Sequence, residues 1–218
     1  MSLIDLSGEF PPEAVRKIRL REVPLKSAQT AYTGMVYDFE VNSMNGSYID
    51  LPGHIRETDN GERADNVPMD KFYRVPCSVI RLNRKSGSGA VTGTELEQAF
   101  GGKVATPALM INALGPLDPD EIDNRSVWLD FSALDWMIES GVRLLLSDIY
   151  ESKALHGVFL KLFAAGISTV CGLRNMCKVR GRFAEVTVLF PKIATLTQIP
   201  CRVLADDNIN DETSIKEK

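Results

Sequence analysis

Histidine is scarce in this sequence: the 218 residues include only His54 and His156. Zinc sites of hydrolytic enzymes often take two or three histidines from one chain, so counting nearly excludes a multi-histidine metal centre. The four cysteines form neither a CxxC pair nor a zinc-ribbon spacing. We therefore expect a reduced, cytoplasmic protein in which cysteine serves as a small apolar residue.

The sequence also has no basic block, no long apolar run and no signal-peptide pattern. Its charges are mixed, with a net charge of −4, so nucleic acid is not an expected partner. No apolar stretch approaches the roughly 20 residues that span a bilayer, so no membrane association is expected. The composition, 44% hydrophobic and 25% charged, is that of a globular protein. We expect one domain over residues 1–206 and a polar, disordered tail over 207–218.

Seven runs rich in branched apolar residues predict β-strands. The runs are residues 34–41, 77–83, 108–114, 142–150, 167–173, 184–190 and 201–205. Helical patterns separate several of the later runs, which predicts an α/β domain with a mixed sheet, partly parallel, and helices packed on it. The strand-rich first half is expected to add an antiparallel portion.

Two short helices are predicted from capping signals. In the segment 92–102, Thr94 is the expected N-cap and Gly101 the expected stop. In the segment 131–141, Ser132 is the expected N-cap. In this second segment Asp135 follows the cap by three residues and Gly141 is the expected stop.

A third helix is predicted within residues 152–166. The residues expected on its apolar face are Leu155, Val158, Phe159, Leu162 and Phe163. His156 is expected on the flank of this helix and partly exposed. Asp148, at the end of the strand before it, is expected to cap or form a turn.

The segment MNGSYIDLPGH joins a glycine, a carboxylate, a proline and an imidazole within one loop. It resembles the loop H-x-G-T-H-x-D-x-P-x-H of a cyclase family that includes bacterial kynurenine formamidases and isatin hydrolases. Gly46, Asp50, Pro52 and His54 match this pattern, and Ser47 replaces the threonine. Because the carboxylate Asp50 and the imidazole His54 of the pattern are both present, this loop is the leading candidate for a functional site.

Other segments resemble the same family in the same order along the chain. They are IDLS at residues 4–7, GVRLLLSDI with Asp148, LFAAGISTVCGL, and PKIATLTQIPCRVLA with Pro200 and Arg202. The resemblance implies a swivelling β/β/α domain that assembles as a dimer or tetramer. Near the final turn, Thr195 and Gln198 replace family glycines.

The resemblance implies metal-assisted hydrolysis of an amide or lactam, with arylformamidase as the best-defined family reaction. In that chemistry zinc or manganese lowers the pKa of a bound water, and the last histidine of the loop acts as base or acid. The family's metal-ligand positions fall here on Met44, Tyr48, Asp50, Phe159 and Cys171. Only the aspartate is a family ligand, so we expect no zinc, manganese or other cofactor.

Each candidate residue has a functional and a structural interpretation. His54 could be a surviving acid/base or a loop histidine bonded to nearby backbone. Asp50 could orient His54 or Tyr48, or could bind loop amides in an Asx turn. Tyr48 could donate a proton to an oxyanion, or could fill the space of a lost ligand. Cys171 is expected to be a core thiol, because Arg174 is the only cation near it in sequence.

Three functions remain open from the sequence. The first is a diverged hydrolase that acts on a small carbonyl compound with His54, Tyr48 and Asp50, and without metal. The second is an inactive protein of the same fold that binds a small molecule. The third is a metal-dependent amidohydrolase with unusual ligands. A homo-oligomer is expected in each case from the family resemblance.

Overall fold

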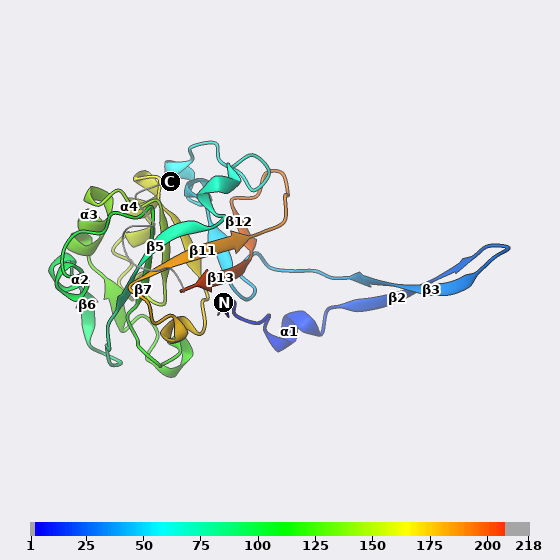
Figure 1. The fold of residues 1–218 in the computed structure, drawn as a ribbon, viewed down its shortest axis with the longest axis horizontal. Helices are drawn as coiled ribbons and strands as arrows, with labels where there is room; N and C mark the ends of the chain where they lie inside the picture. Colours follow the sequence, from blue (N-terminus) through cyan, green and yellow to red (C-terminus); the bar gives the residue numbers. More distant parts are fainter. Residues whose placement is uncertain (1–2, 208–218) are drawn as a thin grey trace.

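A nine-stranded mixed sheet forms the body of the protein, with the strand order β1-β13-β11-β5-β7-β9-β10-β4-β12 (Figure 1). The computed structural model describes residues 3–207, so the predicted tail lies outside the described residues except for Asp207. The strands of this sheet are β1 (Leu3–Asp5), β4 (Tyr48–Asp50), β5 (Val75–Arg81), β7 (Ala108–Asn112), β9 (Leu144–Ser147), β10 (Ser168–Cys171), β11 (Phe183–Leu189), β12 (Gln198–Pro200) and β13 (Arg202–Asp206).

The mixed α/β architecture predicted from the sequence is confirmed. Each of the seven predicted runs contains a strand. The central strands β5, β7, β9 and β10 are parallel, and the outer pairs are antiparallel. The parallel strands are nearly continuous apolar runs because they are buried on both faces.

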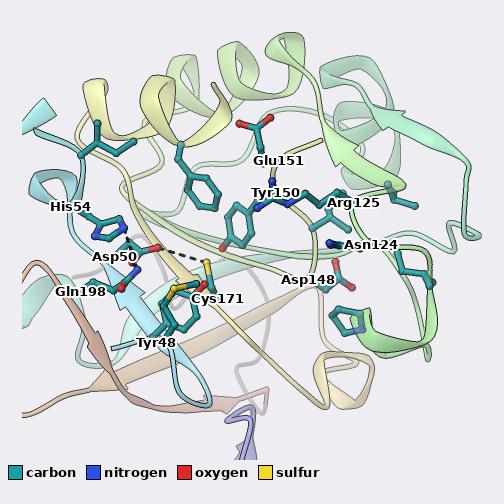
Figure 2. A pocket seen from close by; sticks show the side chains of 17 residues that line it. Tyr48, Asp50, His54, Asn124, Arg125, Asp148, Tyr150, Glu151, Cys171 and Gln198 are labelled. Carbon is teal, nitrogen blue, oxygen red and sulfur yellow. Dashed lines mark hydrogen bonds between the residues drawn. The ribbon is translucent and has the colours of Figure 1, made fainter. Parts of the chain in front are cut away.

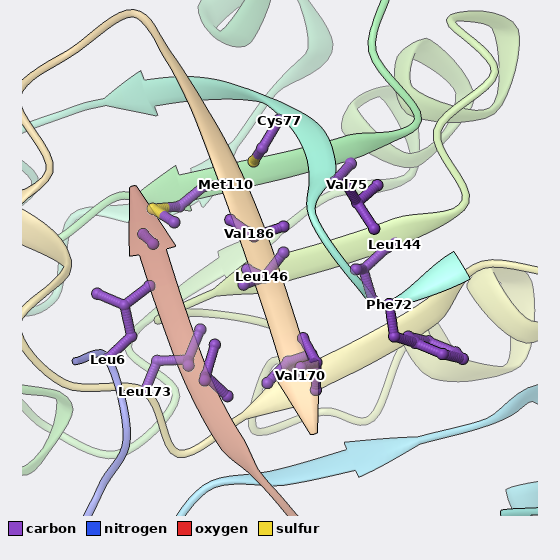
Figure 3. Packing of buried hydrophobic residues seen from close by; sticks show 14 of the residues in the cluster. Leu6, Phe72, Val75, Cys77, Met110, Leu144, Leu146, Val170, Leu173 and Val186 are labelled. Carbon is purple, nitrogen blue, oxygen red and sulfur yellow. The ribbon is translucent and has the colours of Figure 1, made fainter. Parts of the chain in front are cut away.

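Alternate side chains of the central strands supply two separate hydrophobic cores. Ala108 and Met110 of β7 face the inside of the curled sheet, where they meet the outer strands (Figure 3). Leu109 and Ile111 face the other way and pack in the core that includes the helices. This period of two follows from the pleat of a strand, and it explains why a short run serves two layers.

Three helices cover the outer face of the sheet: α2 (Gly93–Phe100), α3 (Phe131–Glu139) and α4 (Val158–Ala164). The two predicted N-caps are wrong by two residues. Thr92, not Thr94, caps α2, because its hydroxyl accepts from the Glu95 amide. Asp130, not Ser132, caps α3 through the Ala133 amide. In both cases the polar residue nearer the preceding strand meets the free amides of the first turn.

The third predicted helix is shorter than its apolar pattern. Helix α4 begins at Val158, so Leu155 lies outside it, with a φ of 52° and 66% of its surface exposed. His156 also precedes the helix and is not on its flank. The carboxylate of Glu151 accepts hydrogen bonds from the amides of His156, Gly157 and Val158, which fixes the helix start.

Strand β4 is held in place by close contact between three glycine-bearing segments. A Cβ atom on Gly172 would lie 2.5 Å from the carbonyl oxygen of Gly46, and one on Gly46 would lie 2.8 Å from that of Gly8. Gly46 has a φ of 67°, which glycine adopts without strain. The buried Ser47 hydroxyl accepts from the Gly8 amide and donates to the Gly172 carbonyl, both at 2.7 Å. The matched Gly-Ser pair therefore has a structural role.

A long antiparallel hairpin, β2 (Arg19–Lys26) and β3 (Ala31–Asp38), extends away from the body (Figure 1). Its cross-strand pairs include Leu20 with Tyr37 and Leu25 with Tyr32, and all four side chains are exposed.

The remaining elements are short. They are α1 (Pro12–Val15), the parallel pair β6 (Gly89–Val91) and β8 (Val127–Leu129), and the 3₁₀ turns η1 (Pro52–His54), η2 (Arg56–Thr58), η3 (Met69–Lys71), η4 (Pro119–Glu121) and η5 (Met176–Lys178). Within residues 3–207, no helix has both the length and the apolar character needed to cross a bilayer.

Candidate functional site

A cavity of about 380 Å³ opens beside strand β4 and collects the residues of the predicted site (Figure 2). Tyr48, Asp50 and His54 all line it, together with Cys171 and Gln198. Its volume lies within the range of small-molecule sites.

Strand pairing explains why these side chains meet. Tyr48 and Asp50 are two residues apart, so they point to the same face of the sheet, while Ile49 between them enters the core. On one side β10 places Cys171 opposite Tyr48, and on the other side β12 places Gln198 opposite Asp50. Directly paired residues of neighbouring strands have adjacent side chains. The strand register alone therefore brings Tyr48, Asp50, Cys171 and Gln198 together as one wall of the cavity.

The Gln198 amide links the two central residues of the wall. Its Nε2 donates to Asp50 Oδ1 at 2.7 Å and lies 3.2 Å from His54 Nε2. Its Oε1 accepts from the Ser43 hydroxyl. Asp50 is only 3% exposed, and its other carboxylate oxygen is 3.8 Å from the Cys171 sulfur. Asp50 thus reaches His54 through Gln198, and side chains supply the hydrogen bonds to its carboxylate.

His54 stands at the edge of the cavity, on the turn η1 directly after β4. Pro52 occupies the first position of this turn, where its fixed φ suits the helical start and its missing N–H is not needed. The imidazole is exposed on one side and meets the buried Phe163 ring edge-on, at 6.5 Å between centroids. The imidazole therefore packs against Phe163 on one side and is open to solvent on another.

Burial controls the protonation of the wall. It raises the pKa of the Tyr48 phenol and of the Cys171 thiol, and their closeness to each other and to Asp50 adds to the shift of Tyr48. Both groups are therefore protonated donors at neutral pH. Cys171 is not an activated thiolate, which agrees with its expected role as a core thiol. Burial also raises the pKa of Asp50, although its bond from Gln198 opposes the shift.

Two further carboxylates line the cavity but are engaged by backbone amides. Asp148 accepts from the amides of Ala113 and Leu114 and from Asn112 Nδ2, at 2.8 to 3.0 Å. Glu151 caps helix α4 as described above. Asp148 therefore has the turn-forming role predicted for it. Backbone amides hold both carboxylates in place in the cavity lining.

The other walls are aromatic and cationic. Phe159 stacks on Tyr150, with centroids 5.1 Å apart, and the Tyr150 hydroxyl is committed to the Val170 carbonyl at 2.7 Å. Arg125 and Asn124 line the side away from His54 and Gln198 (Figure 2). The cavity thus offers a flat apolar surface with a positive charge at one side and the Asp50 network at the other.

The five family ligand positions do not fit zinc or manganese. Met44 is a thioether that is 55% exposed at the rim, and Phe159 has no donor atom. Tyr48 and Cys171 would each have to lose a proton to bind a metal, and burial raises the pKa of both. Within residues 3–207, no three His, Cys, Asp or Glu side chains come together as a possible metal site.

The sequence brought forward His54, Asp50 and Tyr48, and the structure places these three on one cavity wall. His156 lies elsewhere: it is exposed, its Nδ1 is 3.2 Å from the Ser152 hydroxyl, and it lines a different hollow beside β8. The sequence did not assign a role to Gln198. Its only signal was a polar side chain where the family has glycine.

Asp50 and Asp148 provide a matched pair for testing the electrostatics. We expect Asp50→Asn to raise the melting temperature at pH 7, because burial raises the pKa of Asp50 and so disfavours its ionised form in the folded state. This gain should shrink as the pH falls from the raised pKa of Asp50 toward the ordinary carboxyl pKa near 4, and it should vanish below that value, where Asp50 is protonated in both the folded and the unfolded chain. Thermal unfolding between pH 4 and pH 8 measures both effects.

Asp148→Asn should instead lower the free energy of unfolding by about 1–3 kcal/mol at pH 7, because its new N–H₂ group would face amide donors. Burial raises the pKa of Asp148 as well, so the expected difference between the two substitutions rests on the backbone amides that Asp148 faces. Equal effects would contradict this difference.

Comparison with known proteins agrees with this fold. A family model described as "Putative cyclase" matches residues 4–152, more than half of the chain. No curated protein sequence matches the chain. Similar solved structures include isatin hydrolase A from Ralstonia solanacearum (16% identity, TM-score 0.68, covering 94% of this chain and 91% of that one). Isatin hydrolase A from Labrenzia aggregata is also similar (17%, 0.67, 94% and 93%).

A predicted metal-dependent hydrolase from Bacillus stearothermophilus shows the same likeness (16%, 0.64, 95% and 98%). At these identities the three structures support the fold, and the family model carries the assignment. The chain belongs to the putative cyclase family.

Proposed function

We propose that this protein hydrolyses a small carbonyl compound, an amide, lactam or lactone, without a divalent metal. The observation that carries the proposal is the single cavity wall formed by His54, Asp50 and Tyr48. The similarity to isatin hydrolases, which share the fold, supports a cyclic or aryl amide as the substrate class. An arylformamide is the linear counterpart of such a substrate.

The protons of the reaction can be assigned to residues of this wall. His54 takes a proton from water as the water oxygen attacks the carbonyl carbon. The Tyr48 hydroxyl, which burial keeps protonated, donates a hydrogen bond to the oxygen that becomes negative. The imidazolium then gives its proton to the leaving nitrogen or oxygen, and the carbon–heteroatom bond breaks. His54 returns to its neutral state, so the proton balance closes.

The apolar and cationic walls suit a flat substrate. The stacked Phe159 and Tyr150 rings provide an aromatic surface, and Arg125 provides a positive charge for a polar substituent. A conjugated carbonyl lying on the rings would present its edge to His54.

Turnover of an arylformamide, an isatin-type lactam and an aryl lactone tests this proposal. We expect His54→Ala to lower kcat/KM by about 10²- to 10⁴-fold, the usual contribution of a general acid/base. His156→Ala is the matched control and should leave turnover unchanged, because His156 is exposed and outside this cavity. Circular dichroism would confirm that both variants fold.

Turnover that survives in His54→Ala, or that requires added zinc or manganese, would contradict the proposed mechanism. If no compound is converted but one raises the melting temperature, the protein is a binding protein of the same fold, because a ligand of the native state stabilises it by mass action.

We also propose that the protein is a homo-oligomer that buries the β2–β3 hairpin. A two-stranded hairpin is marginally stable alone in water, and this one exposes Leu20, Leu25, Tyr32 and Tyr37. The chain from this hairpin leads into the cavity rim at Met44. A second copy that covers the hairpin would shield apolar surface close to the site.

Light scattering should give a mass of at least twice the 24.1 kDa of one chain. The double variant Leu20→Ser/Tyr37→Ser should shift the protein toward the monomer, since it removes an exposed apolar cross-strand pair. Lys26→Ser/Ala31→Ser alters another pair of the same hairpin and should leave the mass unchanged. A wild-type monomer at micromolar concentration would overturn this proposal.

A further inference from the structure

The orientation of the Gln198 amide is fixed by its neighbours. The Ser43 hydroxyl donates to Oε1, and Asp50 Oδ1 accepts from Nε2 at 2.7 Å. An ionised carboxylate can only accept, so it must face the amide nitrogen and not the amide oxygen. Exchanging the two atoms would place the amide oxygen against the carboxylate. The Ser43 hydroxyl can donate or accept, so the contact with Asp50 is the one that selects the orientation of this side chain.

This orientation determines which nitrogen of His54 carries the proton. Gln198 Nε2 lies 3.2 Å from His54 Nε2, and an amide nitrogen donates but does not accept. In a hydrogen bond between these atoms, His54 Nε2 must be the bare acceptor. A neutral imidazole has one proton, which is then on Nδ1.

We propose that Gln198 is a positioning residue whose amide NH₂ joins Asp50 to His54 in place of a cation and keeps His54 in the Nδ1–H tautomer. One N–H attracts a carboxylate oxygen and the other an imidazole lone pair, which are the same two kinds of atom that a hydrolytic metal binds. A neutral amide does this without removing a second ion from water, which is unfavourable beside the buried Asp50 carboxylate.

The tautomer has a consequence for catalysis that rests on the proposed hydrolysis. The bare Nε2 is the atom able to take a proton from water, so Gln198 would define the basic nitrogen. This nitrogen has one lone pair, so the reacting water must first displace the Gln198 N–H from it. Once Nε2 is protonated, it and the Gln198 NH₂ group are both donors, and the contact cannot re-form until the proton has left. The protonated ring is then free to deliver its proton to a leaving group. The longer of the two Gln198 contacts is the one that this step breaks.

Nitrogen-15 NMR of the two imidazoles tests the tautomer directly. At about pH 8.5, above the ordinary histidine pKa near 6.5, the wild-type spectrum should show His54 with a proton on Nδ1 and a non-protonated Nε2. His156→Gln assigns the two signals, because the chain has only two histidines.

Two substitutions should change the His54 signal in different ways. Gln198→Glu replaces the donor by a carboxylate that only accepts, so the His54 proton should move to Nε2. Gln198→Ala removes the partner, so the Nδ1–H preference should be lost. The His156 signals should stay unchanged in both variants, which separates a local effect from a general change in structure.

A wild-type His54 with its proton on Nε2 would overturn the inference. An unchanged His54 tautomer in a folded Gln198→Ala protein would also overturn it. If Gln198→Glu does not fold, the Gln198→Ala spectrum alone tests the role of Gln198. Because the spectrum is recorded without substrate, it also separates the two proposals. An inactive protein with the expected tautomer would refute the hydrolysis and leave the role of Gln198 standing.

Discussion

The site depends on the close approach of three backbone segments at Gly8, Gly46 and Gly172. No side chain larger than hydrogen fits at the last two positions without moving a neighbouring carbonyl. The Ser47 hydroxyl bonds to the other two segments from the same point. This contact fixes strand β4 between β10 and β12, and the pairing register then places Cys171 and Gln198 beside Tyr48 and Asp50.

A buried carboxylate with neutral hydrogen-bond partners defines the electrostatics of this wall. Asp50 is nearly inaccessible to water, and its partners are the neutral amide of Gln198 and the thiol of Cys171. Such partners compensate only part of the cost of removing a charge from water, so the pKa of Asp50 is raised. The same burial keeps Tyr48 protonated. The wall is consequently rich in hydrogen-bond donors, which is what the proposed hydrolysis requires at the substrate oxygen.

The sequence predicted elements whose apolar pattern is local. The seven strand runs and the α/β class could be read because buried strands require continuous branched residues. The helix starts were harder to predict from the sequence. Thr92 and Asp130 cap their helices because the preceding strands end there, and strand ends depend on tertiary structure. Leu155 fitted the helical spacing but lies before the helix, since the Glu151 carboxylate fixes the start at Val158.

The candidate site could be predicted only in part, because some of its residues are brought together by tertiary structure. His54, Asp50 and Tyr48 lie within one short segment, so a single motif revealed them together. Gln198 is 148 positions from Asp50 along the chain, and only the antiparallel register of β12 on β4 brings them together. No spacing rule within one sequence reports such a pairing.

We propose that hydrogen bonds, and not a metal, organise this wall. The most direct test is the metal content of purified, untagged protein by elemental mass spectrometry, before and after incubation with zinc and manganese followed by desalting. We expect well under one metal ion per chain in every sample. About one zinc or manganese ion per chain, retained through desalting, would contradict this proposal.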